Sequence, residues 1–276
     1  MHILLGLFSA VAAGSSDFLG GFASRNAKAI MVNAGSHFVG IFAVLAAALI
    51  FGGDPSGSDL AWGLAAGLGS SLGLLSLYQG IAHSRVAIVS PIAGVGAAAL
   101  PVLYSVATGD SLTTLAAIGI ALGLAAIALV SIQSGEAKGS TAAGVLYGFG
   151  GAVGLGFLLV GLGQATDDAG VWPVMYSRAS GFCVLLVVMA LTRVRPQLPK
   201  SALPATIGVG ILAAGANSFF TAGVQIGSLS TVAVVSAMFP AVTVLLARFV
   251  FRERLQPIQI VGLLCALVAV GLIASG

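Results

Sequence analysis

The sequence predicts an all-α membrane protein with ten transmembrane helices, arranged as two inverted-topology repeats of five helices. Three observations predict this fold: the composition, a series of long apolar stretches and an internal repeat. Of the 276 residues, 58% are hydrophobic and only 7% are charged, whereas about a quarter of the residues in a typical soluble domain carry a charge. So few charges cannot cover a water-facing surface, and the composition therefore excludes a soluble enzyme and a nucleic-acid-binding protein.

Ten apolar stretches are long enough to cross a bilayer, which takes about 20 helical residues. Short polar breaks rich in Gly, Pro, Ser, Asp and Arg separate them, as at 52–57 and 192–196. The stretches cover residues 3–23, 31–51, 60–82, 86–108, 113–133, 141–163, 171–191, 203–225, 229–250 and 257–275.

The positive charges of the connections predict the orientation of the chain. Lys and Arg occur beside odd-numbered connections and are absent from the even-numbered ones, which carry aspartates instead. By the positive-inside rule the odd connections are cytoplasmic and both termini lie outside. We therefore expect a multi-pass protein of the cell membrane, either a plasma or an inner membrane. The basic residues concerned are Arg25, Lys28, Arg85, Lys138, Arg193, Arg195, Lys200, Arg252 and Arg254.

The internal repeat relates the two halves of the chain. Residues 60–131 can be laid without a gap on residues 203–274, with Gly67 opposite Gly210 and Asp110 opposite Glu253.

This alignment divides the chain into a first five-helix repeat at 1–134, a linker at 135–140 and a second five-helix repeat at 141–276. An odd number of spans in each half forces the second half to enter the membrane upside down. Secondary transporters have this architecture, and they bind substrate between the repeats near the middle of the membrane.

Three short motifs resemble those of one transporter family. They are Phe-Arg-Glu-Arg-Leu at 251–255, its weaker copy Thr-Gly-Asp-Ser-Leu at 108–112, and Ser-Asp-Phe-Leu-Gly-Gly at 16–21. With them, the whole chain resembles the EamA-type branch of the drug/metabolite transporter superfamily. The resemblance implies a ten-helix exporter or exchanger of small metabolites, often amino acids or drug-like compounds. Many members of that family keep both termini inside, whereas the charges here predict the reverse, so the direction of transport stays open.

Asp17 is the only acidic residue well inside a predicted span. A charged Asp at the centre of a membrane helix costs about 2.5–3.5 kcal/mol, so a partner or a wet cavity is expected. Because the first two spans run in opposite directions, Asp17 and His37 lie at similar depth, where a carboxylate and an imidazole are candidates for proton coupling. The alternative is structural: Asp17 braces the helix ends near Arg25 and Lys28, and His37 only bonds a neighbouring helix.

Arg178 takes the place of His37 in the second half of the chain. Its guanidinium is suited to bind a substrate carboxylate with two parallel hydrogen bonds. The alternative is that the long side chain reaches the interface or pairs with Asp167 or Asp168.

A polar stripe on the eighth predicted span is expected to line the substrate cavity. Asn217, Thr221 and Gln225 are spaced at i, i+4 and i+8 on one face of an otherwise apolar helix. The repeat places Tyr78 opposite Thr221, with Ser71 two turns before Tyr78. The alternative is hydrogen bonding between helices without a ligand.

Three prolines lie inside predicted spans: Pro91 and Pro101 in the fourth and Pro240 in the ninth. Each removes a backbone N–H, so we expect a kink at each position. These kinks either expose carbonyl oxygens to substrate or are static features of the helices.

The leading hypothesis is a secondary transporter, and not an enzyme. The sequence contains no Walker A, HExxH or GxSxG motif, and we expect no cofactor and no metal. The partners expected are a small-molecule substrate and the lipid bilayer, with the chain as a monomer or a homodimer. Two alternatives are a membrane scaffold or assembly protein and, with less support, an intramembrane enzyme.

Overall fold

The structure is a computed structural model that describes residues 1–108, 113–131, 140–227, 232, 235–250 and 257–275. The described residues form α-helices and short 3-10 turns, with no strand among them. The helices are α1 (His2–Ser24), α2 (Ala29–Phe51), α3 (Gly57–His83), α4 (Val86–Ala107), α5 (Thr114–Ser131), α6 (Thr141–Gly163), α7 (Trp172–Leu191), α8 (Leu203–Gln225), α10 (Phe239–Val250) and α11 (Pro257–Ser275). The 3-10 turns are η1 (Asp167–Ala169) and η2 (Lys200–Ala202).

Within the described part of the chain, six helices are long and apolar enough to cross a membrane by length and composition: α1, α2, α3, α6, α7 and α8. The prediction of an all-helical, multi-pass membrane protein is thereby confirmed. Large apolar side chains such as Phe42, Leu146 and Val187 are exposed on the outside of the bundle. Lipid would cover these side chains in a membrane.

The ninth predicted span differs from its prediction. Residues 237–238 form a turn, and α10 begins only at Phe239. The prediction of one continuous helix through 229–250 is therefore wrong at this point. Pro240 is the second residue of α10, in the first turn of the helix, where a missing N–H is tolerated. Pro91 and Pro101 both lie inside α4, as predicted.

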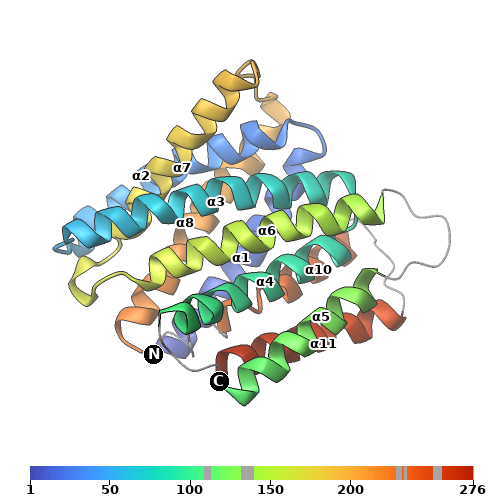
Figure 1. Cartoon of the computed structure of the whole chain (residues 1–276). Coiled ribbons are helices and arrows are strands. Elements are labelled where there is room, and N and C mark those ends of the chain that lie inside the picture. Colours follow the sequence, from blue (N-terminus) through green and yellow to red (C-terminus); the bar gives the residue numbers. More distant parts are fainter. Residues whose placement is uncertain (109–112, 132–139, 228–231, 233–234, 251–256, 276) are drawn as a thin grey trace.

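The helices pack in a bundle whose two edges are formed by different pairs. Figure 1 shows α5 beside α11 at one edge and α2 beside α7 at the other, with the remaining helices between them. The most extensive contacts join α3 to α6, α5 to α11, α4 to α6 and α1 to α8. The two termini lie at the same end of the bundle (Figure 1).

Glycines allow the closest of these contacts. Gly69 and Gly73 lie one turn apart on α3 and face Gly154 on α6. A Cβ at Gly73 would lie 2.8 Å from the Cα of Gly154, which is closer than real Cβ contacts. The backbones of α3 and α6 therefore touch along this stripe, in the manner of small-xxx-small packing in membranes.

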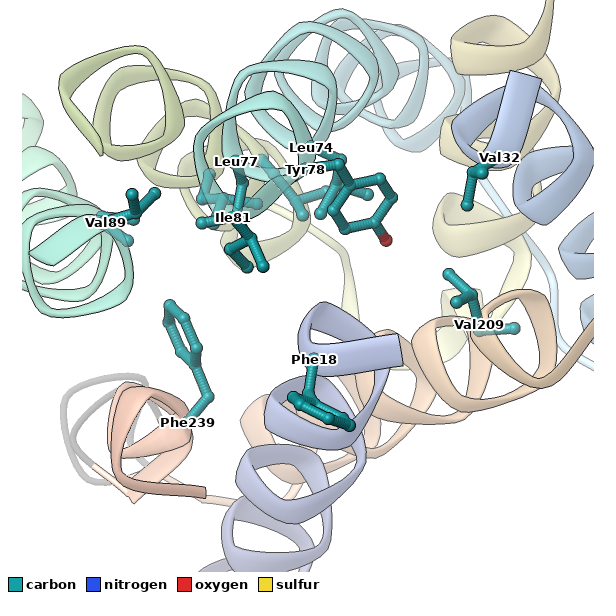
Figure 2. Close-up of a cluster of buried hydrophobic side chains, with 14 of the residues drawn as sticks. Phe18, Val32, Leu74, Leu77, Tyr78, Ile81, Val89, Val209 and Phe239 are labelled. Atoms are coloured by element: carbon teal, nitrogen blue, oxygen red, sulfur yellow. The ribbon is translucent and has the colours of Figure 1, made fainter. Parts of the chain in front are cut away.

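The largest cluster of buried apolar side chains runs through the centre of the bundle, with members from α1, α2, α3, α4, α6, α7, α8 and α10. Figure 2 shows Leu77 and Ile81 packed together on α3, while Tyr78 extends its ring toward Val32 and Val209. Tyr78 is fully buried, and its ring stands directly against Gly20 of α1. Gly20 therefore lets α1 approach α3 closely at Tyr78.

Candidate functional site

An interior cavity of about 60 Å³ lies in the middle of the bundle. One water needs about 10–15 Å³ of such space, so the cavity has room for a few waters only. Its walls are mostly apolar and its polar groups are few. The lining residues are Ser9, Ala13, Ser16 and Asp17 of α1, Ser70 and Leu74 of α3, Ala97 of α4, Leu155, Leu158 and Leu159 of α6, Arg178 of α7, Ala213, Ala216, Asn217 and Phe220 of α8, and Ser236, Ala237 and Phe239.

Two ionisable side chains, one acidic and one basic, line this cavity. Asp17 is 5% exposed and Arg178 is 1% exposed. Neither makes a hydrogen bond or an ion pair with another described residue, and the Nε and Nη1 of Arg178 are buried without a partner. Burying a charge without a partner is costly, so both groups need a counter-charge or water from within the cavity.

Of the three residues in the polar stripe predicted on α8, one lines the cavity and two do not. Asn217 lines the cavity, as expected. Thr221 is fully buried and its hydroxyl has no partner among the described residues, but it is not part of the lining. The hydroxyl of Tyr78 is also buried outside the lining, close to Ser16 and in electrostatic reach of Asp17 and Arg178.

Gln225 lies at the end of α8, outside the cavity lining. Its Nε2 donates hydrogen bonds of 3.0 Å to the carbonyl oxygens of Thr166 and Gly170, in the connection between α6 and α7. The same connection is held to α3, because the carboxylate of Asp59 accepts from the backbone N–H and the hydroxyl of Thr166, each at 2.8 Å. Gln225 therefore ties α8 to a loop that is already fixed on α3.

His37 and Asp17 are not joined by a hydrogen bond in the described structure. The Nδ1 of His37 lies 3.1 Å from the carbonyl oxygen of Asn33, and its Nε2 lies 3.3 Å from the Oγ of Ser70. The neighbouring charge of His37 is that of Arg178 on α7. The structure thus brings His37 close to Arg178, which occupies the equivalent position in the second repeat. Asp17 lies on α1 and is not hydrogen-bonded to His37.

Ser71 points away from the cavity. Its hydroxyl donates to the carbonyl oxygen of Leu68, and its own carbonyl accepts a 2.7 Å hydrogen bond from the Nδ2 of Asn33. Ser71 therefore joins α2 to α3 through its backbone, while the preceding residue, Ser70, faces the cavity.

Several lining residues went unnoticed in the sequence: Ser9, Ser16, Ser70 and Ser236. Small hydroxyl side chains are common in membrane helices, and no pattern separates a lining serine from one that bonds its own helix. For Ser16 the sequence did hold a signal: it directly precedes Asp17, the acidic residue inside the first span, and a polar neighbour of an intramembrane acid can share its cavity. Ser236 lies directly before the turn at 237–238 that precedes α10, and Ser236 and Ala237 both line the cavity.

The two halves of the chain match one family separately. Residues 1–132 and residues 142–275 each match the EamA-like transporter family. The chain belongs to the EamA-like transporter family. The resemblance noted in the sequence, to the EamA branch of the drug/metabolite transporters, is thereby confirmed.

Comparison with solved structures supports the same fold for this EamA-like protein. The crystal structure of a protein that is 15% identical has a TM-score of 0.69 and covers 98% of this chain and 95% of that one. At this identity the likeness concerns the fold alone. No curated protein matches the chain.

The EamA-like motifs at 108–112 and 251–255 and the linker at 135–140 lie mostly or wholly outside the described residues. Among the residues that the structure describes, no three His, Cys, Asp or Glu side chains gather as metal ligands would. The chemistry available in the cavity is therefore that of one carboxylate, one guanidinium, an amide and hydroxyl groups.

Proposed function

We propose that this EamA-like protein is a secondary transporter that carries small zwitterionic metabolites, such as amino acids, or drug-like compounds across the membrane by alternating access. The observation that carries the proposal is the burial of Asp17 and Arg178 in one cavity at the centre of the bundle, with no hydrogen bond or ion pair of either to another residue that the structure describes. Ionisable groups kept inside a membrane usually serve a substrate or ion path. A substrate with an ammonium and a carboxylate group would neutralise both charges.

The apolar part of the lining suits an apolar substrate body. Leu74, Leu158, Phe220 and Phe239 contribute such surface to the cavity. Small-molecule sites typically combine apolar walls with a few polar groups that fix orientation. An amino acid with an apolar side chain matches this combination.

The two five-helix halves supply the means of alternation. Under the offset of the internal repeat, α3 corresponds to α8 and α6 to α1. The contacts of α3 with α6 and of α1 with α8, both among the most extensive in the bundle, are thus counterparts of each other. Two inverted repeats that exchange conformations open a central site to each side of the membrane in turn.

The small volume of the cavity also favours alternation. An amino acid cannot fit into about 60 Å³, so helices must part before substrate enters. We place the protein in the cell membrane with its odd-numbered connections on the cytoplasmic side. We assign export or exchange as the direction of transport. Asp17 is our candidate for coupling transport to a proton, while the hydrogen bonds of His37 give it a positioning role.

Counterflow in proteoliposomes tests this function. Vesicles that contain the purified protein are preloaded with unlabelled L-phenylalanine, a sugar or a cationic drug, and uptake of the labelled compound is measured. We expect saturable exchange of L-phenylalanine and none in vesicles without protein. Folded protein that exchanges no compound would overturn the proposal and favour a scaffold without transport.

A further inference from the structure

Ser70 has one side-chain hydrogen bond in the described structure. It lies near the middle of α3, is fully buried and lines the cavity. Its Oγ lies 3.3 Å from the Nε2 of His37 on α2. Which of these two atoms donates depends on where His37 carries its proton.

The backbone of α2 settles the tautomer of His37. The Nδ1 of His37 lies 3.1 Å from the carbonyl oxygen of Asn33, one turn earlier on the same helix. A carbonyl oxygen only accepts, so Nδ1 carries the hydrogen. In a neutral imidazole, Nε2 is then an acceptor, and the hydroxyl of Ser70 must be the donor.

The surroundings of His37 keep the imidazole neutral. His37 is fully buried and its charged neighbour is Arg178, whereas no described carboxylate contacts it. A second positive charge beside an unpaired guanidinium in the membrane interior is strongly disfavoured. Asn33 is itself fixed, because its Nδ2 donates to the carbonyl oxygen of Ser71 at 2.7 Å and so holds α2 on α3.

We infer that Ser70 is a substrate-binding residue that offers only its lone pairs to the cavity, with His37 as the positioning residue that accepts the hydrogen bond of its hydroxyl. The substrate group that reaches Ser70 must therefore be a donor, such as an ammonium group. Ser70 and the carboxylate of Asp17 then form the accepting side of the cavity, and Arg178 forms the donating side. This inference rests on the proposed function and adds the residue that selects for an N–H donor.

The test compares two substrates that differ at the ammonium nitrogen, which carries three hydrogens in L-phenylalanine and three methyl groups in N,N,N-trimethyl-L-phenylalanine. Both carry the same charges, but only the first can donate to Ser70. A hydrogen bond to a charged group contributes enough to change affinity by about tenfold or more. We expect Ser70→Ala to raise the half-saturation concentration of L-phenylalanine in counterflow about tenfold and to leave that of the trimethyl compound unchanged.

Neighbouring variants separate this role from a structural one. Ser71→Ala, on the next residue of α3, should change neither substrate, and Ser70→Thr should restore L-phenylalanine exchange because it keeps the hydroxyl. His37→Leu should reproduce the selective loss, and the double variant with Ser70→Ala should lose no more than either single variant, because His37 acts through Ser70. Thermal melting of each purified variant confirms that it is folded.

The outcomes distinguish the two proposals. If the wild-type protein exchanges neither compound, the proposed substrate class fails, and the assignment of Ser70 fails with it. If the wild-type protein exchanges L-phenylalanine but Ser70→Ala weakens both compounds equally, or neither, transport stands and the role of Ser70 is overturned.

Discussion

At the scale of single residues, Arg178 is the clearest case of a group that lacks a partner. Its guanidinium is buried on α7 between Gly40 of α2 and the cavity, with two of its nitrogens unpaired. Snorkelling to the interface, the alternative drawn from the sequence, does not fit a side chain that is 1% exposed. Nor is Arg178 paired with Asp167 or Asp168 in the described structure.

We predict that Arg178→Gln weakens transport only of substrates that have a carboxylate. Loss of a charge-assisted hydrogen bond should raise the half-saturation concentration of L-phenylalanine about 10–100-fold. Phenethylamine, which lacks the carboxylate, should be unaffected in the same counterflow assay. Arg195→Gln, at an exposed position outside the cavity, is the matched control. An equal effect of Arg178→Gln on both substrates would show that Arg178 does not bind the substrate carboxylate.

Asp17 allows a second prediction at this scale. If its carboxylate carries the coupled proton, Asp17→Asn cannot release it, because an amide does not titrate. We expect the variant to keep exchange under equal pH on both sides, with a higher half-saturation concentration because its neutral amide oxygen binds the substrate ammonium more weakly, and to lose uptake driven by a pH gradient. Asp54→Asn, an exposed residue between α2 and α3, should behave as wild type. Gradient-driven uptake that survives in Asp17→Asn would rule out coupling at this residue.

At the scale of helices, glycine decides how closely α3 and α6 approach. The sequence contains many Gly-x-x-x-Gly pairs, and the structure puts Gly69 and Gly73 of one such pair directly on Gly154. By contrast, a Cβ at Gly271 of α11 would meet nothing within 4 Å. Glycine therefore has a packing role at position 73 and none at position 271.

We predict opposite effects of alanine at these two glycines. Gly73→Ala must push the backbones of α3 and α6 apart and should destabilise the protein by about 1–3 kcal/mol, as overpacking does. Gly271→Ala should be neutral or stabilising by up to about 1 kcal/mol, because it lowers only the backbone entropy of the unfolded chain. Thermal melting in detergent measures both. A Gly73→Ala protein as stable as wild type would contradict close backbone contact between α3 and α6.

At the scale of the whole molecule, one end of the bundle is tied across the two halves. Gln225 joins α8 to the connection between α6 and α7, which Asp59 holds on α3. Alternating access requires that end to open. A single side chain with two hydrogen bonds is a contact that thermal motion can break.

We predict that Gln225→Ala makes the cavity more accessible from the end of the bundle that contains the termini. The measurement is the labelling rate of Asn217→Cys by a membrane-impermeant thiol reagent, after Cys183 and Cys265 have been replaced by Ser. Labelling from that side should become several-fold faster, as expected for the loss of about 1 kcal/mol of hydrogen bonding. Gln197→Ala, exposed in the connection between α7 and α8, should have no such effect. Unchanged labelling in Gln225→Ala would mean that Gln225 does not restrict opening.

The class of the protein, most of its helices and its family followed from the sequence alone. Hydropathy and span length are local properties, and a membrane helix forms its hydrogen bonds within its own segment, so each span can be recognised without its neighbours. The same is true of Pro91 and Pro101, whose effect on α4 is local. The turn at 237–238 was not predicted. A proline such as Pro240 is compatible both with a kink inside a helix and with the start of a new helix, and the sequence alone does not distinguish the two.

The site depended on tertiary structure. Asp17, Arg178 and Asn217 were singled out by residue type and do line the cavity, since charged and amide groups inside a span have few other places to lie. Adjacent Ser70 and Ser71 differ only in the direction they face on α3, and Gln225 meets a loop about 60 residues away in the chain. The sequence by itself thus determined a duplicated membrane bundle, whereas only packing between distant helices decided which hydroxyl, carboxylate and guanidinium groups share one cavity. The physical reason is that rotation of a helix about its axis is fixed by its neighbours, not by its own residues.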